Sequence, residues 1–188
     1  MGADIWLFCE VCTIEQGKKV WFPAELEGWD DPRDYELFYL LGGVRGYENS
    51  EQDTYPPIAP CKGLPEDVNL LTIDQERMSL EVADAVSYYT LKELKASRYS
   101  GIMKIKGWVD EEEFRTAGPV TVTERGFRQD FYFVHPDAPP WKREGLVLRE
   151  WNGILNGNLI FLVRQMERVK RERQISSDED IRIIFWIA

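Results

Sequence analysis

The chain has 188 residues, of which 44% are hydrophobic and 13% aromatic, a composition that excludes a disordered protein and suits one domain with a large core. Its 33 acidic and 23 basic residues give a net charge of −10, which argues against direct binding of nucleic acid or of an anionic membrane surface. No apolar stretch approaches the length of a membrane-spanning helix, and we recognise no signal peptide. We therefore expect a single domain over residues 1–188 that is located in the cytoplasm.

The first two elements are predicted to form a β-hairpin. Residues 5–11 are apolar and β-prone, and a short polar connection leads to a second such segment at residues 19–26. Proline has no N–H to donate to a neighbouring strand, so Pro23 predicts that the second strand lies at a sheet edge or ends early.

A helix and then a long loop are predicted next. Apolar residues recur at helical spacing over residues 35–41, and Gly42 and Gly43 end the pattern. Residues 46–69 are rich in proline and glycine and show no periodicity, which predicts a loop. Loops of this length within a compact domain are usually functional or mobile.

The middle of the chain carries weaker patterns. Residues 79–86 fit either a short helix or a strand, and Thr90 begins a capping-box pattern for a short helix that ends at Ala96. A strand is predicted at residues 102–109. A further pair of strands is predicted at residues 120–123 and 131–134.

The last two elements are the clearest. Residues 159–173 carry an apolar face at helical spacing, with cations in the last turn where they suit the helix dipole. Residues 181–187 are so apolar that we predict a central, buried strand. The expected class is α+β, with a mostly antiparallel sheet that includes the N- and C-terminal strands and helices packed on one face.

Several segments together resemble a family of bacteriophage and prophage proteins that usually open with Met-Gly-Cys-Asp-Ile-His and end in a strand of the Arg-Ile-Val-Phe type. The matching segments, in order, are Met1-Gly-Ala-Asp-Ile5, Asp34-Tyr-Glu-Leu-Phe-Tyr-Leu-Leu41, Gly43-Val-Arg45, Gly63-Leu-Pro-Glu-Asp-Val68, Tyr89-Thr-Leu-Lys-Glu-Leu94 and Asp180-Ile-Arg-Ile-Ile-Phe-Trp186. The match spans the chain apart from residues 102–151. The family has no established activity, so the resemblance implies a phage origin and the host cytoplasm as location.

The resemblance also implies a loss. Members often carry His after the opening Asp-Ile, a second His before the Leu-Thr-Leu helix and Asp after the final strand, a set that suits a metal or acid/base site. Here these places hold Trp6, residues 85–88 without His, and Ala188, while Asp4 is retained. Any such site of the family is therefore expected to be absent here.

The cysteines and the single histidine are the other candidates for a metal site. Cys9 and Cys12 have the spacing of a zinc or redox pair, and Cys61 and His135 would complete a set of four. A separation of three within a strand points two side chains to opposite faces, and zinc pairs sit at turns. We therefore expect no metal, no cofactor and no catalytic residue.

Ligand-binding residues are predicted in and beside the loop over residues 46–69. Tyr47 and Tyr55 offer rings that stack on a base, and Arg45 and Lys62 offer cations for a phosphate. In the alternative interpretation, the loop covers the edge of the sheet and its rings fill local contacts.

An acidic run is a candidate for binding a protein partner. Asp110, Glu111, Glu112 and Glu113 would mimic nucleic-acid phosphates and occupy a basic groove on a target protein. The alternative is a solvated turn, the usual role of such runs.

These observations favour a phage-encoded accessory protein that acts by binding, in counter-defence. It either inhibits a host defence protein, in the manner of an anti-CRISPR protein, or sequesters a nucleotide signal. The alternatives are a metal-dependent hydrolase of nucleotides with Asp4 as a ligand, and an acidic nucleic-acid mimic. The expected partners are thus a host defence protein or a small nucleotide, with no direct nucleic acid and no membrane.

Overall fold

The computed structural model describes residues 3–30, 32–45, 54–74, 77–118, 121–123 and 126–188, with backbone alone at residues 77, 121–123 and 126–128. It confirms the predicted α+β class. Paired strands are antiparallel throughout, and the first and last strands lie side by side in one sheet.

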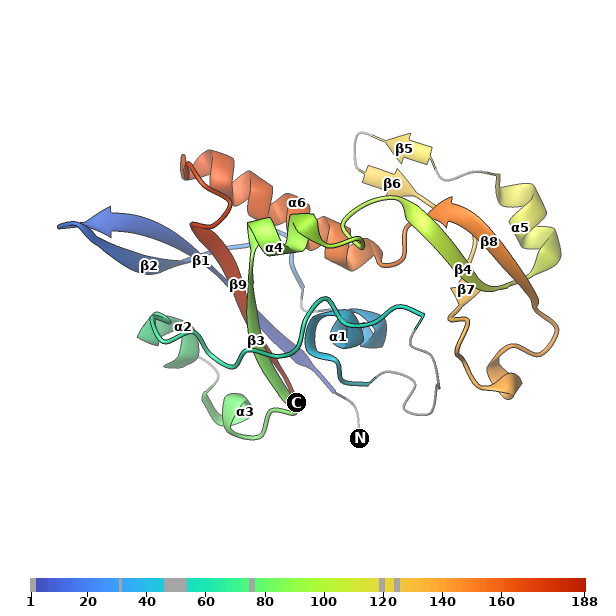
Figure 1. Cartoon of the computed structure of the whole chain (residues 1–188), viewed down its shortest axis with the longest axis horizontal. Helices are drawn as coiled ribbons and strands as arrows, with labels where there is room; N and C mark the ends of the chain where they lie inside the picture. Colours follow the sequence, from blue (N-terminus) through green and yellow to red (C-terminus); the bar gives the residue numbers. More distant parts are fainter. Residues whose placement is uncertain (1–2, 31, 46–53, 75–76, 119–120, 124–125) are drawn as a thin grey trace.

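The main sheet has the strand order β2–β1–β9–β3 (Figure 1). Its strands are β1 (Ile5–Glu15), β2 (Lys18–Ala24), β3 (Ala85–Thr90) and β9 (Ile181–Ile187). Every residue of β9 is buried, because β1 and β3 flank it and other elements cover both its faces, which confirms the central position predicted from its apolar run. β2 lies at the edge of the sheet, as Pro23 predicted.

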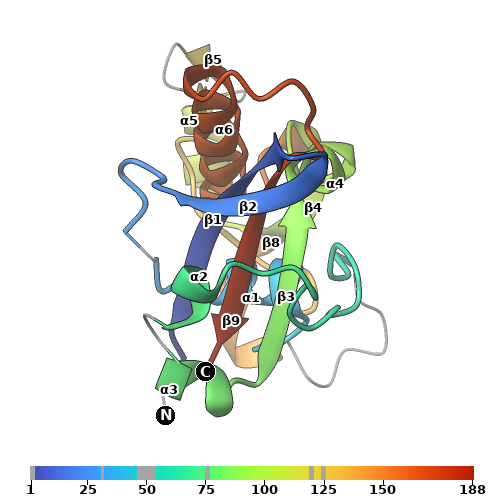
Figure 2. The same cartoon turned by 90° about the vertical axis from the view of Figure 1, so that its left-hand side faces the viewer.

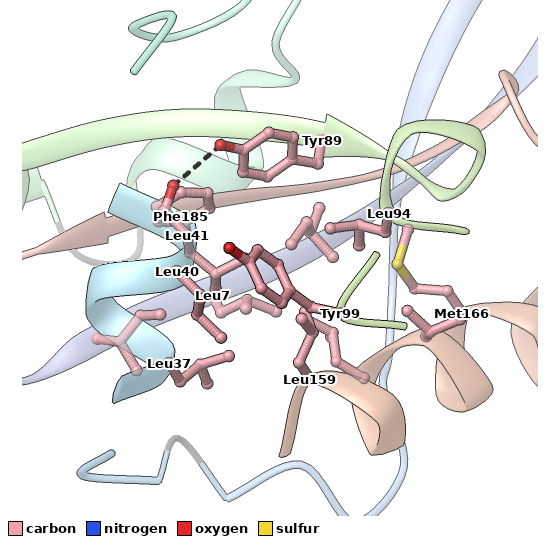
Figure 3. Close-up of a cluster of buried hydrophobic side chains, with 14 of the residues drawn as sticks. Leu7, Leu37, Leu40, Leu41, Tyr89, Leu94, Tyr99, Leu159, Met166 and Phe185 are labelled. Carbon is pink, nitrogen blue, oxygen red and sulfur yellow. Dashed lines mark hydrogen bonds between the residues drawn. The ribbon is translucent and has the colours of Figure 1, made fainter. Parts of the chain in front are cut away.

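Three helices pack on one face of the main sheet. They are α1 (Tyr35–Gly42), α4 (Leu91–Ala96) and α6 (Gly157–Glu172), close to the helices predicted from periodicity and capping. Their apolar side chains form the core together with alternate residues of β1, β3 and β9 (Figure 3). The hydroxyl of Tyr89 donates a hydrogen bond to the Leu41 carbonyl at 3.0 Å, which ties β3 to the end of α1.

Two short helices cover the opposite face of the main sheet (Figure 2). They are α2 (Leu70–Asp74) and α3 (Arg77–Glu81). The Thr72 hydroxyl donates to Glu10 Oε1 at 2.6 Å, and Trp186 Nε1 donates to the Ser79 hydroxyl at 2.9 Å. These bonds anchor the two helices to β1 and β9.

A second sheet stands beside the main one, in the strand order β7–β4–β8 (Figure 1). Its strands are β4 (Met103–Val109), β7 (Phe133–Val134) and β8 (Val147–Gly153), accompanied by α5 (Glu111–Ala117), the 3-10 turn η1 (Pro140–Lys142) and a two-stranded ribbon of β5 (Thr121–Thr123) and β6 (Gly126–Arg128). β8 leads directly into α6, so the chain returns from this sheet to the main core at residues 154–157.

In this half of the chain, one prediction is wrong and one strand is missed. The strand predicted at residues 120–123 pairs with β6 rather than with residues 131–134, and β7 pairs with β4. β8 was not predicted, because Arg149 and Glu150 interrupt its apolar pattern. Of the predicted loop, residues 46–53 lie outside the described part of the chain, and residues 54–69 contain neither helix nor strand.

Candidate functional site

A cavity of about 620 Å³ lies between the N-terminal half of α1, residues 129–135, and the turn that joins β8 to α6. Its volume is within the range of about 300–1,000 Å³ that small organic ligands occupy. Its aromatic lining consists of Tyr35, Tyr39, Tyr55, Phe131, Tyr132 and Phe133. Its polar and charged lining includes Asp34, Glu36, Arg45, Gln129, His135 and Lys142. Tyr132 is 75% exposed and Tyr35 is 45% exposed, so the cavity reaches the surface beside these rings.

Local sequence signals place α1 against this cavity. Asp34 Oδ1 accepts the Leu37 N–H at 3.0 Å and caps the start of the helix, and Gly43 ends it with a left-handed φ of 68°. Leu37 and Leu41 face the core. Tyr35, Glu36 and Tyr39 of the same helix line the cavity.

Glu36 is the most perturbed acid in the cavity. Burial raises its pKa to about 7, and the nearby charge of Asp34 acts in the same direction, while a hydrogen bond from Asn156 opposes both. That bond, from Asn156 Nδ2 to Glu36 Oε2, is long at 3.3 Å. Within the described residues, Glu36 Oε1 accepts no hydrogen bond. The cavity therefore holds a desolvated carboxyl with one oxygen available to a ligand.

Two cations line the same cavity. Arg45, at the end of the turn after α1, has a left-handed φ of 64° and contacts Asp84 through Nη2 at 3.0 Å. Its side chain remains 38% exposed. Lys142 lies in η1 with its Nζ 5.2 Å from the centroid of the Trp141 ring, which is exposed. Both cations line the cavity, and an anionic ligand there would share Arg45 with Asp84.

His135 and Tyr55 form a further wall of the cavity. Their rings meet edge to face, with centroids 5.2 Å apart. The N–H of Asp137 donates to His135 Nδ1 at 3.1 Å, and Asp137 Oδ2 lies 3.6 Å from the same nitrogen. The Tyr55 hydroxyl donates to the Lys106 carbonyl at 2.9 Å and accepts the Lys106 N–H at 2.6 Å. The Tyr55 hydroxyl is therefore bonded to the backbone, and the side chain is buried at 4% exposure.

The structure brings together two of the four predicted ligand-binding residues. Arg45 and Tyr55 line one cavity. Lys62 lies elsewhere, with its Nζ 2.8 Å from Glu93 and 4.0 Å from the Tyr88 ring centroid, which makes it part of the packing along β3. Tyr47 lies outside the described residues.

Sequence reasoning missed Glu36, Gln129 and Lys142. Glu36 follows a helix N-cap, where an acidic residue is ordinary, so its burial appears only in three dimensions. No local pattern marks Gln129 or Lys142. The sequence suggests His135 only as a metal ligand, yet its ring is a wall of the cavity.

The acidic run over residues 110–113 begins α5 instead of forming a turn. Asp110 Oδ1 accepts the N–H groups of Glu112 and Glu113 at 3.0 and 2.8 Å, as an N-cap does. Glu111 contacts Arg149 at 2.7 Å. Asp110 and Glu111 thus have structural roles, and Glu112 and Glu113 remain exposed.

The candidate metal ligands lie apart. Cys9 belongs to the main core, where burial raises its pKa to about 12, whereas Cys12 lies outside that core cluster and Cys61 is exposed. Among the described residues, no three His, Cys, Asp or Glu side chains gather as a metal site requires. Asp4 Oδ1 accepts hydrogen bonds from Arg33 at 2.9 and 2.6 Å.

Comparison with protein-family models, curated proteins and solved structures finds no match for this chain. Across the described ranges, no helix has both the length and the apolar character needed to cross a membrane. The chemistry of the cavity itself is what marks it as the candidate site: aromatic walls, two cations and a half-buried carboxyl with a raised pKa.

Proposed function

We propose that the chain binds a nucleotide in the cavity beside α1 and retains it without turnover. The observation that carries this proposal is the combination of several aromatic rings with Arg45 and Lys142 in one cavity of suitable size. Aromatic side chains stack on bases, with about 1–3 kcal/mol per base. Arginine and lysine meet phosphate oxygens through charge-assisted hydrogen bonds.

The fold supports an anionic ligand in a second way. The N-termini of α1 and α6 both reach the cavity, at Asp34 and Gly157. The positive ends of two helix dipoles therefore add to the field of the cations. This field is local, so it is compatible with a net charge of −10 that disfavours long nucleic acids.

The biological role proposed for this binding is counter-defence by a phage-encoded protein in the host cytoplasm. Sequestration of a nucleotide signal requires tight binding and no catalysis, and the cavity supplies both stacking and charge. The phage origin rests on the resemblance of the sequence. Inhibition of a host defence protein would instead use the outer surface, where Glu112 and Glu113 are exposed.

Turnover of the nucleotide is the second candidate function. Glu36 and His135 line the same cavity, and side chains of these types serve as general acid and base. The metal-dependent version, with Asp4 as a ligand, has no such support, since Asp4 is bound to Arg33.

Calorimetric titration with GMP, AMP, CMP and UMP tests the proposal. We expect at least one of them to bind, Arg45→Ala to weaken it by about tenfold, and chromatography to recover it unchanged. Arg149→Ala is the matched control, because Arg149 is also a half-exposed arginine with one acidic partner but lies outside the cavity. Binding of none of the four, or equal losses in the two variants, would contradict the proposal. Conversion of the nucleotide would favour the enzyme.

A further inference from the structure

The half-buried carboxyl of Glu36 lines the cavity and can accept hydrogen bonds from a ligand. Its Oε2 accepts one long hydrogen bond, from Asn156 at 3.3 Å, and its Oε1 accepts none from the residues that the structure describes. Asn156 Nδ2 makes a shorter bond of 2.8 Å with Asp34, which is therefore its main partner. Glu36 is half-buried and its Oε1 is not among the fully buried atoms, so a ligand with suitable donors can reach it and replace water there.

Gln129 lines the same cavity and contributes hydrogen-bond donors, where Glu36 contributes acceptors. Its Oε1 faces two donors, Trp151 Nε1 at 3.2 Å and the Ile154 N–H at 3.4 Å. These donors fix the orientation of the amide, because only the oxygen of the amide can accept from them. The Nε2 group of Gln129 consequently keeps both its hydrogens for other partners within the described structure.

We infer that the cavity selects a guanine base, with Glu36 accepting from its N1–H and N2–H groups and Gln129 donating to its O6. This inference rests on the proposed function and names the ligand of that site. Guanine is the base that presents two adjacent donors beside an acceptor on its Watson–Crick edge. A carboxylate accepts two such donors at once, in a charge-assisted bidentate contact.

The other bases fit this pair of side chains less well. Adenine and cytosine each offer one exocyclic amino group next to a ring nitrogen that accepts, so at about pH 8, where Glu36 is mostly ionised, one carboxylate oxygen would face a lone pair. Uracil offers a single N–H between two carbonyls. Each mismatch leaves a polar group covered by the ligand without a partner, which lowers affinity by about tenfold or more.

The aromatic and charged groups around Glu36 suit the rest of a guanine nucleotide. The ring of Tyr132 lines the cavity, is 75% exposed and offers a stacking surface for the purine. Arg45 and Lys142 lie on the same lining and suit the phosphate. Any base can stack on an aromatic ring, so stacking does not distinguish one base from another. Selection among bases therefore depends on Glu36 and Gln129.

The test is calorimetric titration of the full chain at about pH 8, where Glu36 is mostly ionised, with GMP, IMP, AMP, CMP and UMP. IMP differs from GMP only in lacking the N2 amino group, and we expect it to bind about tenfold more weakly. Glu36→Gln is nearly isosteric and should remove most of this difference, whereas Glu112→Gln, on the exposed surface of α5, should retain it. Gln129→Leu provides a second variant and should weaken both GMP and IMP, which share O6.

The outcomes separate this inference from the proposed function. Equal affinities for the five nucleotides, or a preference for AMP, would overturn guanine selection while leaving nucleotide binding intact. An unchanged preference for GMP over IMP in a folded Glu36→Gln variant would overturn the role of Glu36. Binding of none of the five would overturn the proposed function, and guanine selection with it.

Discussion

Asn156 Nδ2 donates a hydrogen bond to Asp34 Oδ2 at 2.8 Å, so the residue that caps α6 is bonded to the residue that caps α1. Asn156 Oδ1 meanwhile accepts the Leu159 N–H at 2.9 Å. The Asn156 side chain thus caps α6 and also bonds to the cap of α1. Both helices reach the cavity at this point.

Loss of this bridge should lower stability. We expect Asn156→Ala to reduce the free energy of unfolding by about 2 kcal/mol, because it removes an N-cap and a buried hydrogen bond together. Urea unfolding measures the change. Asn158→Ala is the matched control, since Asn158 also donates to Asp34 at 2.8 Å but caps no helix, and its cost should be about 1 kcal/mol or less. Equal costs for the two variants would contradict the double role of Asn156.

The protonation of Glu36 should make stability depend on pH. Burial raises its pKa from 4.5 to about 7, so between these values the folded chain holds a proton that the unfolded chain releases. The free energy of unfolding should therefore fall as pH rises from about 4.5 to about 7 and change little through Glu36 above that. Glu36→Gln should match the wild type near pH 5 and exceed it near pH 8, by up to about 3 kcal/mol.

Urea unfolding of both proteins at the two pH values tests this. Glu112→Gln controls for the general effect of removing one negative charge, because Glu112 is exposed. A Glu36→Gln variant whose stability differs from that of the wild type by the same amount at both pH values would show that folding does not raise the pKa of Glu36, against this account.

Arg182 and Glu10 form the buried ion pair of the main sheet. Arg182 Nη2 lies 2.8 Å from Glu10 Oε2, with the two side chains 4% and 0% exposed. Arg182→Ala would leave Glu10 buried without its counter-charge, and we expect a loss of about 3–5 kcal/mol. Lys104→Ala breaks the exposed pair with Glu150 and should cost under about 1 kcal/mol. A loss below about 1 kcal/mol for Arg182→Ala in thermal or urea unfolding would contradict the importance of the pair.

The cysteines should differ sharply in reactivity. Cys61 is exposed, whereas Cys9 and Cys12 are buried and burial raises the pKa of Cys9 to about 12. A thiol reagent should therefore modify the native chain chiefly at Cys61 and reach the other thiols after denaturation. Mass spectrometry of the labelled peptides locates the modified residue, and Cys61→Ser should abolish the rapid phase. Rapid labelling of Cys9 in the native chain would contradict its place in the core.

Much of the fold follows from local signals. The apolar run at residues 181–187 predicted the central strand, and Thr90 with its capping box predicted the start of α4. α5 carried a similar signal, an N-cap at Asp110 followed by an acidic first turn, which was interpreted as a charged surface segment. β8 gave no such signal, because its half-exposed strand alternates irregularly.

The site was less accessible to sequence reasoning than the fold. Its lining comes from α1, from residues 129–135 and from residues 154–157, which only tertiary packing brings together. Burial of Glu36 depends on these distant segments, and neither its type nor its position in the helix reveals it. Arg45 and Tyr55 were predictable because they stand in or beside one long loop of unusual composition.

The central claim is that a nucleotide occupies the cavity beside α1. Its most direct test is a methyl NMR titration of the chain with GMP, observing Leu40, Ile154 and Leu155, which line the cavity, and Leu70 and Val82, which are exposed elsewhere. We predict saturable shifts at the first three residues and none at the last two. Saturable shifts confined to other surfaces, or no shifts at nucleotide concentrations that saturate binding by calorimetry, would contradict the claim.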